Sequence, residues 1–101
     1  MESVRIAPHA DRTELVFEGR LVAAGVREVH RRLDEVLARA VPIELHAEGL
    51  ERIDTAGVQL LIAFYRTARQ RGLNVQWRSV SPALRASSVT LAVDGLLELP
   101  Q

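Results

Sequence analysis

Short stretches in which apolar and polar residues alternate occur four times along the chain. The apolar members of these stretches are Val4 and Ile6, Leu15 and Phe17, Ile43, Leu45 and Ala47, and Val75 and Trp77. Because successive side chains of a β-strand point to opposite faces, this alternation is typical of strands with one buried and one solvated face. The pattern predicts a sheet with helices packed on one face. Arginine and glutamate side chains are expected on the other face, where opposite charges on neighbouring strands can pair.

Two longer segments between these strands have the 3.6-residue period of amphipathic helices. The first has an apolar stripe made of Val26, Val29, Leu33, Val36, Leu37 and Ala40. It predicts a helix over about residues 24–39. The second predicts a helix over about residues 56–71, with a buried face made of Leu60, Leu61, Phe64, Tyr65 and Ala68. Gly72 is expected to end this helix, because glycine readily adopts the left-handed conformation found at helix C-caps.

A third helix is predicted to begin at Ser81 and Pro82, since serine is a favoured N-cap and proline a favoured first helical residue. Its apolar stripe consists of Leu84 and Leu91, with the small Ser87 and Ser88 between them. Asp94 and Gly95 are expected to end this helix. The last predicted element is a short apolar turn formed by Leu96, Leu97 and Leu99.

The order of these elements predicts the topology. The first two strands are joined by residues 8–12, a connection short enough for an antiparallel hairpin. The later strands are separated by helices, which permits parallel pairing through crossover connections. We therefore expect residues 1–101 to form a single two-layer α/β domain. It contains one mixed sheet of about four strands, with helices packed mainly on one face.

Composition excludes several kinds of chemistry. The 101 residues include 13 basic and 13 acidic side chains, so the formal net charge is zero; every basic residue is arginine, and cysteine is absent. Phosphate loops and Schiff bases that need lysine are excluded, as are thiol catalysis, disulfides and zinc sites built from cysteine. A neutral chain is also a poor match for nucleic acid. No stretch approaches the roughly 20 apolar residues of a membrane span, and the first residues lack a signal-peptide core, so we expect a cytoplasmic protein.

Motifs for catalysis, metal ions or cofactors are not apparent in the sequence. His9, His30 and His46 fall in a loop, on a helix and on a strand without the spacing of metal ligands. The Gly-x-Ser-x-Gly motif of serine hydrolases is absent, and Gly19 and Gly25 do not fit the dinucleotide-binding pattern. We therefore predict a protein that is not an enzyme, with no catalytic residues, no metal ligands and no cofactor.

One segment, residues 50–61, crosses from the third strand into the most apolar helix. Asp54 or Thr55 is expected to cap that helix by accepting a hydrogen bond from a free backbone N–H. Capping alone is one interpretation. The other is a modification site, because a hydroxyl at a helix N-terminus is exposed and the helix dipole stabilises a phosphate placed on it. Ala56 and Gly57 are expected to leave the approach to that hydroxyl open.

The same segment resembles a known family. The sequence Ile-Asp-Thr-Ala-Gly-Val-Gln-Leu-Leu at residues 53–61 is similar to the signature of the STAS domain, the fold of bacterial anti-sigma-factor antagonists. Residues 17–21 resemble the turn after the second strand of that fold. Residues 75–77 and 81–85 resemble its last strand and the following helix, and residues 93–97 resemble its closing segment. Together these segments cover essentially the whole chain in the order of the family.

The resemblance implies a regulatory function. In phosphorylatable members, the hydroxyl residue after the aspartate accepts phosphate from an anti-sigma serine/threonine kinase, and the unmodified domain binds that kinase. Thr55 is accordingly the predicted phosphoacceptor. The resemblance places partner binding at Asp54, Thr55, Ala56, Gly57, Val58, Arg20 and Ser81. Val22 and His46 stand where phosphorylated members often carry acidic residues, so the acidic cluster around the acceptor is thinner here.

Other functions remain open at this stage. The Asp-Thr-small-Gly version of the signature also resembles the STAS subunit of lipid-asymmetry ABC transporters, which binds the ATPase subunit, and similar domains accompany chemosensory systems. Nucleotide binding is a weaker alternative, because phosphates would depend on arginines and helix amides. We expect a protein partner, no direct membrane insertion, and a monomer or a weak homodimer formed through the open sheet face or an edge strand.

Overall fold

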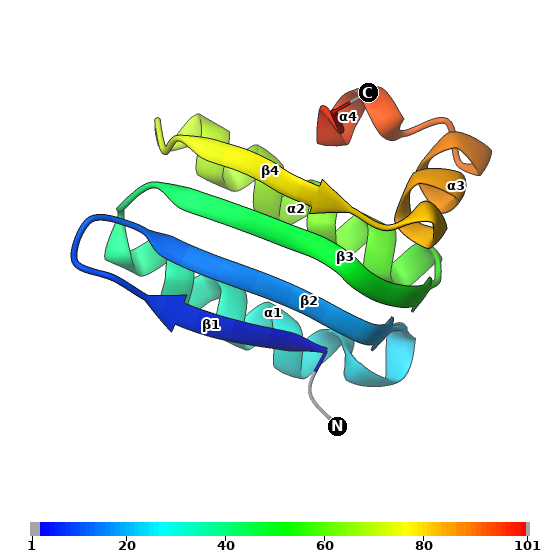
Figure 1. Cartoon of the computed structure of the whole chain (residues 1–101), viewed down its shortest axis with the longest axis horizontal. Coiled ribbons are helices and arrows are strands. Elements are labelled where there is room, and N and C mark those ends of the chain that lie inside the picture. Colours follow the sequence, from blue (N-terminus) through cyan, green and yellow to red (C-terminus); the bar gives the residue numbers. More distant parts are fainter. Residues whose placement is uncertain (1–2, 101) are drawn as a thin grey trace.

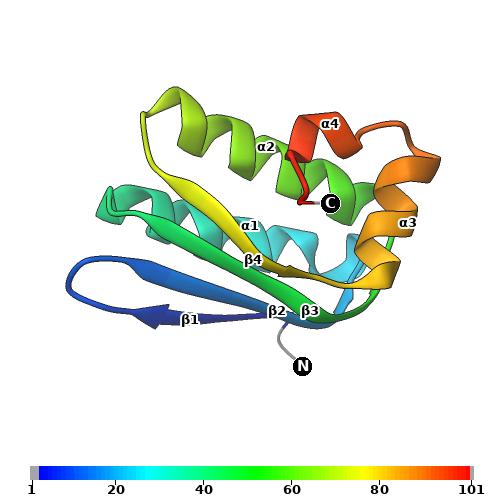
Figure 2. The same ribbon diagram turned by 45° about the horizontal axis from the view of Figure 1, so that its top comes forward.

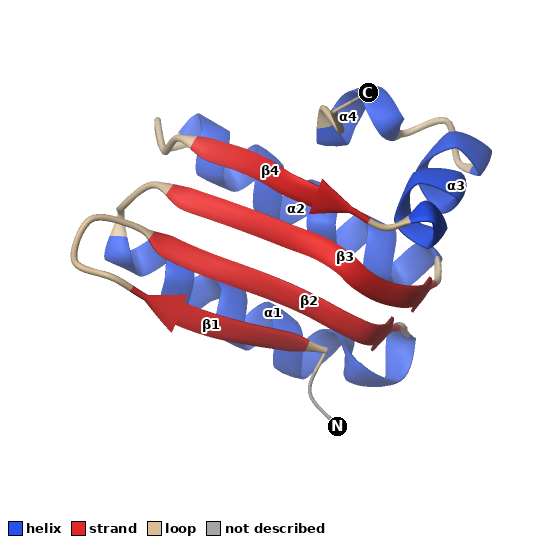
Figure 3. Ribbon diagram, viewed as in Figure 1, coloured by secondary structure: helices blue, strands red, loops and turns tan. Residues whose placement is uncertain are grey.

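The computed structural model describes residues 3–100, in which four strands form a single sheet accompanied by four helices (Figures 1 and 3). In chain order the elements are β1 (Val4–Pro8), β2 (Thr13–Leu21), α1 (Ala23–Arg39), β3 (Ile43–Ile53), α2 (Thr55–Gln70), β4 (Val75–Val80), α3 (Pro82–Thr90) and α4 (Asp94–Leu97). The predicted strands and helices are all present, and the ends of α1 and α2 differ from the predicted ones by at most one residue. Residues 1, 2 and 101 of the predicted domain lie outside the described residues.

The sheet is mixed, as the order of elements predicted. Its strands lie in the order β1-β2-β3-β4, with β1 antiparallel to β2 and the other neighbours parallel. The hairpin closes where Pro8 pairs with Thr13. Helices α1 and α2 connect successive parallel strands. The carboxyl ends of β2 and β3 therefore lie at the same edge of the sheet as the amino ends of α1 and α2.

Helices α1 and α2 cover one face of the sheet and contact each other, whereas the opposite face is open (Figure 2). Alternate strand residues such as Leu15, Phe17 and Leu45 are buried beneath the helices. The residues between them, such as Glu14 and Glu44, lie half-buried on the open face. The alternation in the sequence thus corresponds to the two faces of the sheet. No helix within residues 3–100 is long and apolar enough to cross a bilayer.

Helix α3 packs against β3 at the end of the sheet (Figure 1). The predicted cap is confirmed: the Leu84 amide donates to Ser81 Oγ at 3.0 Å, with Pro82 as the first helical residue. The predicted end is wrong. Helix α3 stops at Thr90, because Ala92 adopts a left-handed conformation with φ of 57°, and Asp94 begins α4 instead.

The apolar stripe of α3 also differs from the predicted one. Leu84 and Ser88 are fully buried, whereas Leu91 is 39% exposed. Leu91 lies beyond the last helical residue and is one of the exposed large apolar side chains, so it is not part of the buried side of α3.

Side-chain contacts tie the last segment of the chain to α2 and β4. Trp77 Nε1 donates to the Leu97 carbonyl oxygen at 2.8 Å, and the Tyr65 hydroxyl donates to Glu98 Oε2 at 2.9 Å. Burial and this bond to Glu98 raise the pKa of Tyr65. Of the predicted apolar turn, Leu97 is fully buried and Leu96 is half exposed.

One predicted turn lies inside a strand. Residues 17–21 were expected to follow the second strand, but β2 continues to Leu21. Register shifts occur between Val16 and Glu18 and between Gly19 and Arg20 in the pairing with β3, and Gly19 has a φ of 68°. Such bulges bend a strand and re-aim its side chains without ending it, and glycine accepts the left-handed conformation that this one needs.

Candidate functional site

Asp54 lies at the edge of the sheet where α1 and α2 begin, and its carboxylate caps both helices. Asp54 Oδ1 accepts from the Gly57 amide and Asp54 Oδ2 accepts from the Ala23 amide, each at 2.9 Å. Val22, the N-cap residue of α1, supplies no side-chain cap of its own. One carboxylate therefore joins the start of α1 to the start of α2. The sequence left open whether Asp54 or Thr55 caps α2; the structure shows that it is Asp54.

The electrostatics of this position keep Asp54 ionised. The hydrogen bond from the Gly57 amide, followed by the one from the Ala23 amide, lowers the pKa of its carboxyl group. Both carboxylate oxygens are occupied by backbone amides at the positive ends of two helices. A carboxylate so stabilised is a weak base, so it is poorly suited to take a proton from a neighbouring hydroxyl.

Gly57 brings α2 into close contact with β2. A Cβ atom at this position would lie 2.3 Å from the Leu21 carbonyl oxygen and 2.8 Å from Ile53 Cγ1. Only glycine allows this approach, since the obstructing oxygen belongs to the backbone. Gly57 thus faces the sheet, and the expectation that it keeps the approach to the Thr55 hydroxyl open is wrong. We call Asp54, Gly57, Leu21 and Ala23 the helix junction.

Thr55 is the first residue of α2 and its side chain is exposed. Its hydroxyl makes no hydrogen bond to another part of residues 3–100. Thr55 borders a hollow of 330 Å³ between the start of α2 and α3. The other residues that line the hollow are Ile53, Asp54, Ala86, Ser87, Thr90 and Leu91. A hydroxyl placed in this way is accessible to a modifying enzyme and to a docking partner.

The predicted partner-binding residues separate into two groups. Thr55 and Arg20 are exposed, and Asp54 and Ala56 are half-buried at the same edge of the sheet. The side chains of Val58 and Ser81 are only 1% and 3% exposed, and Gly57 is buried as well. These three residues are therefore not exposed to a partner. Val58 packs in the core, Gly57 lies against Leu21 and Ser81 caps α3.

Arg52 was not predicted, although the structure places it beside Arg20. The two residues are register partners on β2 and β3, and both are exposed. Neither guanidinium group has an ion-pair partner within residues 3–100. A signal was present in the sequence, because each strand ends with arginine followed by a buried apolar residue, at Arg20-Leu21 and at Arg52-Ile53.

The two residues that stand in place of family acids lie in different surroundings. Val22 is the N-cap residue of α1 and does not line the hollow beside Thr55. His46 lies on the outer face of β3, where its ring faces Glu14. Because neither residue carries a negative charge, these two positions do not form an acidic cluster around Thr55.

Comparisons with known proteins place the chain in a family. A family model described as Mlab, STAS domain matches residues 4–98. An anti-sigma factor antagonist from Mycobacterium paratuberculosis has a similar structure. Its TM-score is 0.77 at 15% identity, with 91% of this chain and 79% of that chain covered. The anti-sigma factor antagonist SpoIIAA of Bacillus, in its unphosphorylated form, has a TM-score of 0.74 at 17% identity, with 92% and 84% covered.

The same fold forms a small part of longer proteins. The structure of Mglu matches with a TM-score of 0.67 at 22% identity over 75% of this chain, which corresponds to 19% of that protein. No curated protein sequence matches the chain. At these identities the solved structures establish the fold, whereas the family model covers nearly the whole described sequence. The chain therefore belongs to the STAS domain family.

Proposed function

We propose that this protein is a non-catalytic regulatory module that binds a kinase of the anti-sigma type through the surface around Thr55, and that phosphorylation of Thr55 ends this binding. The observation that carries the proposal is the exposed Thr55 hydroxyl at the start of α2, beside a carboxylate already held by two helix amides. Among similar structures, SpoIIAA is known in an unphosphorylated and a phosphorylated form.

The charge of the surface supports such a switch. A phosphate on Thr55 adds a charge of about −1.5 to −2 at neutral pH. The protein has a formal net charge of zero, so this one modification makes the net charge negative. At the site itself, the new dianion lies next to the ionised Asp54. A partner that docks on the neutral hydroxyl would then meet two adjacent anions.

The surroundings of Thr55 offer a docking surface of mixed character. The hollow beside it is bordered by Leu91 and Ala86 from the α3 side. Val89 is 60% exposed on the same helix. Arg20 and Arg52 add two guanidinium groups at the same edge of the sheet. This combination of apolar side chains with two guanidinium groups that have no ion-pair partner within residues 3–100 suits a protein partner that carries acidic residues.

Phosphate transfer from an anti-sigma kinase of the same organism tests the proposal. The purified protein is incubated with kinase and ATP, and the modified residue is mapped by mass spectrometry. We expect phosphate on Thr55, none in Thr55→Ala, and unchanged labelling in Thr90→Ala, which removes a hydroxyl from the opposite wall of the same hollow. In a binding assay, Thr55→Glu weakens association with the kinase. Failure to label Thr55 in the wild-type protein contradicts the proposal.

A second candidate is an assembly subunit that binds the ATPase of a lipid-transport ABC complex. It is favoured by two exposed apolar side chains, Leu91 at the hollow and Val89 on α3, which suit a permanent interface. Co-expression with that ATPase, followed by affinity purification, distinguishes the candidates. For the second candidate we expect a stable complex that forms without kinase or ATP and is lost in Val89→Asp. Recovery of the protein without the ATPase contradicts it.

A further inference from the structure

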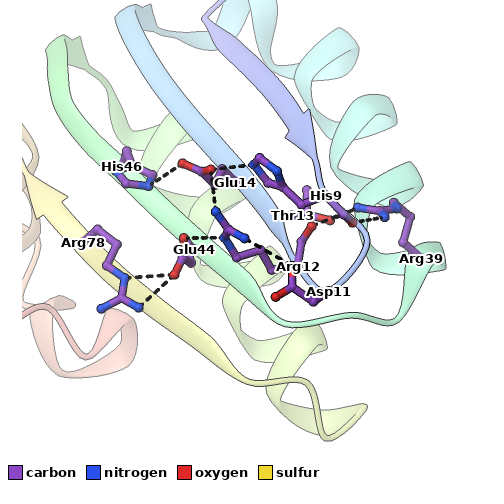
Figure 4. A network of polar contacts seen from close by, with 9 residues as sticks. All are labelled: His9, Asp11, Arg12, Thr13, Glu14, Arg39, Glu44, His46 and Arg78. Atoms are coloured by element: carbon purple, nitrogen blue, oxygen red, sulfur yellow. Dashed lines mark hydrogen bonds and ion pairs between the residues drawn. The ribbon is translucent and has the colours of Figure 1, made fainter.

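Two histidines and two glutamates converge on the open face of the sheet (Figure 4). Glu14 and Glu44 lie near the starts of β2 and β3, whereas the helix junction lies at the ends of these strands. Glu14 on β2 and Glu44 on β3 are register partners. His46 follows Glu44 by two residues, so the pleat of β3 places both side chains on the same face. The fourth group, His9, lies in the hairpin between β1 and β2. We call these four residues the outer-face cluster.

Distances within the cluster are short. His9 Nε2 lies 2.6 Å from Glu14 Oε1, and His46 Nε2 lies 3.3 Å from Glu14 Oε2. Glu14, Glu44 and His46 each offer one ligand atom, and these three atoms lie within 4.8 Å of one another. Ligands around a tetrahedral zinc ion, at 2.0–2.2 Å from the metal, are about 3.3 Å apart. The cluster is therefore close to the spacing of a metal site before any side chain moves.

His46 supplies a second observation that points to a cation site. Its Nε2 atom is buried and makes no hydrogen bond within residues 3–100; it faces Glu14 Oε2 at an ion-pair distance of 3.3 Å. A buried imidazole nitrogen without a hydrogen bond is costly, because it has lost its hydration. Because His46 Nε2 lies near the carboxylates of Glu14 and Glu44, a cation bound between these groups would give the nitrogen a coordination bond.

We propose that the outer-face cluster is a binding site for a divalent transition-metal ion of the zinc type, held by Glu14, Glu44 and His46 with His9 as the fourth ligand. Two imidazole nitrogens and two carboxylates favour such an ion over magnesium or calcium, which prefer oxygen ligands alone. The site is separate from Thr55 and does not depend on the function proposed for it.

Arg12 occupies the position of the cation in the present structure. Its guanidinium group lies 3.4 Å from Glu14 Oε1 and 3.3 Å from Glu44 Oε1, between the two carboxylates (Figure 4). Arg12 belongs to the hairpin, where it also reaches Asp11 at 3.2 Å, so it can leave towards solvent. A metal ion and the Arg12 side chain compete for the same oxygens and exclude each other.

Neighbouring groups would keep the ligands oriented after Arg12 leaves. Arg78 bonds the other oxygen of Glu44, Oε2, at 2.8 Å, which leaves Oε1 for the metal. Arg39 of α1 donates to the His9 carbonyl oxygen at 2.7 Å and so holds the hairpin that carries His9 (Figure 4). Such contacts fix the orientation of ligands, and their loss commonly weakens metal binding.

Calorimetric titration of the full chain with zinc chloride tests the site. We expect one saturable site, weakened about tenfold or more in His46→Gln and in Glu14→Gln. Arg12→Gln strengthens zinc binding several-fold, because it removes the competing cation. If the cluster were only an ion-pair network, Arg12→Gln would loosen it, and zinc affinity would not increase. Cobalt(II) titration gives a second readout, because a tetrahedral site with imidazole ligands produces visible absorption that His46→Gln removes.

Two variants serve as matched controls. His30→Gln removes a histidine that lies 3.6 Å from Asp34 on α1, outside the cluster, and should leave zinc affinity unchanged. Arg5→Gln removes an arginine from the same sheet face without touching the cluster and should also have no effect. Absence of saturable zinc binding to the wild-type protein overturns the proposal. So does weaker binding in Arg12→Gln, or a loss in His30→Gln equal to that in His46→Gln.

Discussion

The two ends of the sheet are stabilised in different ways. At the carboxyl ends of β2 and β3, the helix junction relies on backbone groups: two amides bonded to Asp54 and a carbonyl oxygen in contact with Gly57. On the open face nearer the other end, long and partly exposed side chains meet, with Glu14 and Glu44 shared among arginines and histidines. Backbone groups cannot move aside, whereas solvated side chains can. The helix junction should therefore tolerate little change and the open face much more.

The largest expected effect is that of Gly57→Ala. The added methyl group meets the Leu21 carbonyl oxygen at 2.3 Å, and overpacking of this kind costs about 1–3 kcal/mol of unfolding free energy. Gly25→Ala is the matched control in α1, because a Cβ there meets nothing within 4 Å. The control should raise stability by about 0.4–1 kcal/mol. Urea unfolding of both variants measures the difference. Equal stabilities would show that the junction is not tightly packed.

Next in size is the loss of the shared cap in Asp54→Ala. This change removes hydrogen bonds from two helices at once, so the melting temperature should fall further than in Thr55→Ala, whose side chain bonds to nothing within residues 3–100. Thermal unfolding followed by circular dichroism compares the two variants. A melting temperature for Thr55→Ala as low as that of Asp54→Ala would contradict the assignment of Asp54 as the cap.

Low pH should remove the stabilisation that the Asp54 carboxylate gives to the two helices. The pKa of Asp54 in the folded protein lies below its ordinary value of 3.8, chiefly through the Gly57 amide. A lowered carboxyl pKa stabilises the folded state above the unfolded pKa, and this contribution is lost as the pH falls through the folded pKa. The stability difference between wild type and Asp54→Ala should therefore be constant above about pH 5 and shrink below about pH 4. A difference that persists in acid would mean that Asp54 acts through packing.

On the open face, Glu44→Gln should have a smaller effect that depends on salt. The hydrogen bond from Arg78, together with that from Arg12, lowers the pKa of Glu44, so the carboxylate contributes as an ion. Exposed charges are screened within about 3 Å at 1 M salt. The loss of stability in Glu44→Gln should therefore diminish between low and high sodium chloride. The loss in Asp54→Ala, which involves direct backbone hydrogen bonds, should change less.

The smallest effect is expected for Arg5→Gln. Arg5 Nε lies 2.6 Å from Glu18 Oε1, but the two side chains are 66% and 49% exposed. Ion pairs between exposed side chains contribute about 0.2–1 kcal/mol, so the change in unfolding free energy should not exceed this range. A loss as large as that of Gly57→Ala would show that the open face is a rigid part of the structure.

The elements of the fold could be predicted because each depends on residues close together in the chain. Alternation revealed the strands, and Ser81 with Pro82 revealed the start of α3. The end of α3 was missed, because Asp94 and Gly95 resemble a stop signal while the chain turns earlier, at the left-handed Ala92. The bulge at Gly19 was mistaken for a turn, since glycine favours both and only the pairing with β3 distinguishes them.

Asp54 and Thr55 could be recognised from sequence as a helix start with an accessible hydroxyl, since a cap and its helix are adjacent in the chain. The bond from Asp54 to the Ala23 amide and the contact of Gly57 with Leu21 depend on how β2 and β3 lie side by side. The outer-face cluster gathers residues of the hairpin, β2 and β3 that are far apart in sequence. Periodicity and capping, which act over a few residues, determined the elements and the candidate phosphoacceptor. Strand register, which acts across the sheet, decided which distant groups meet.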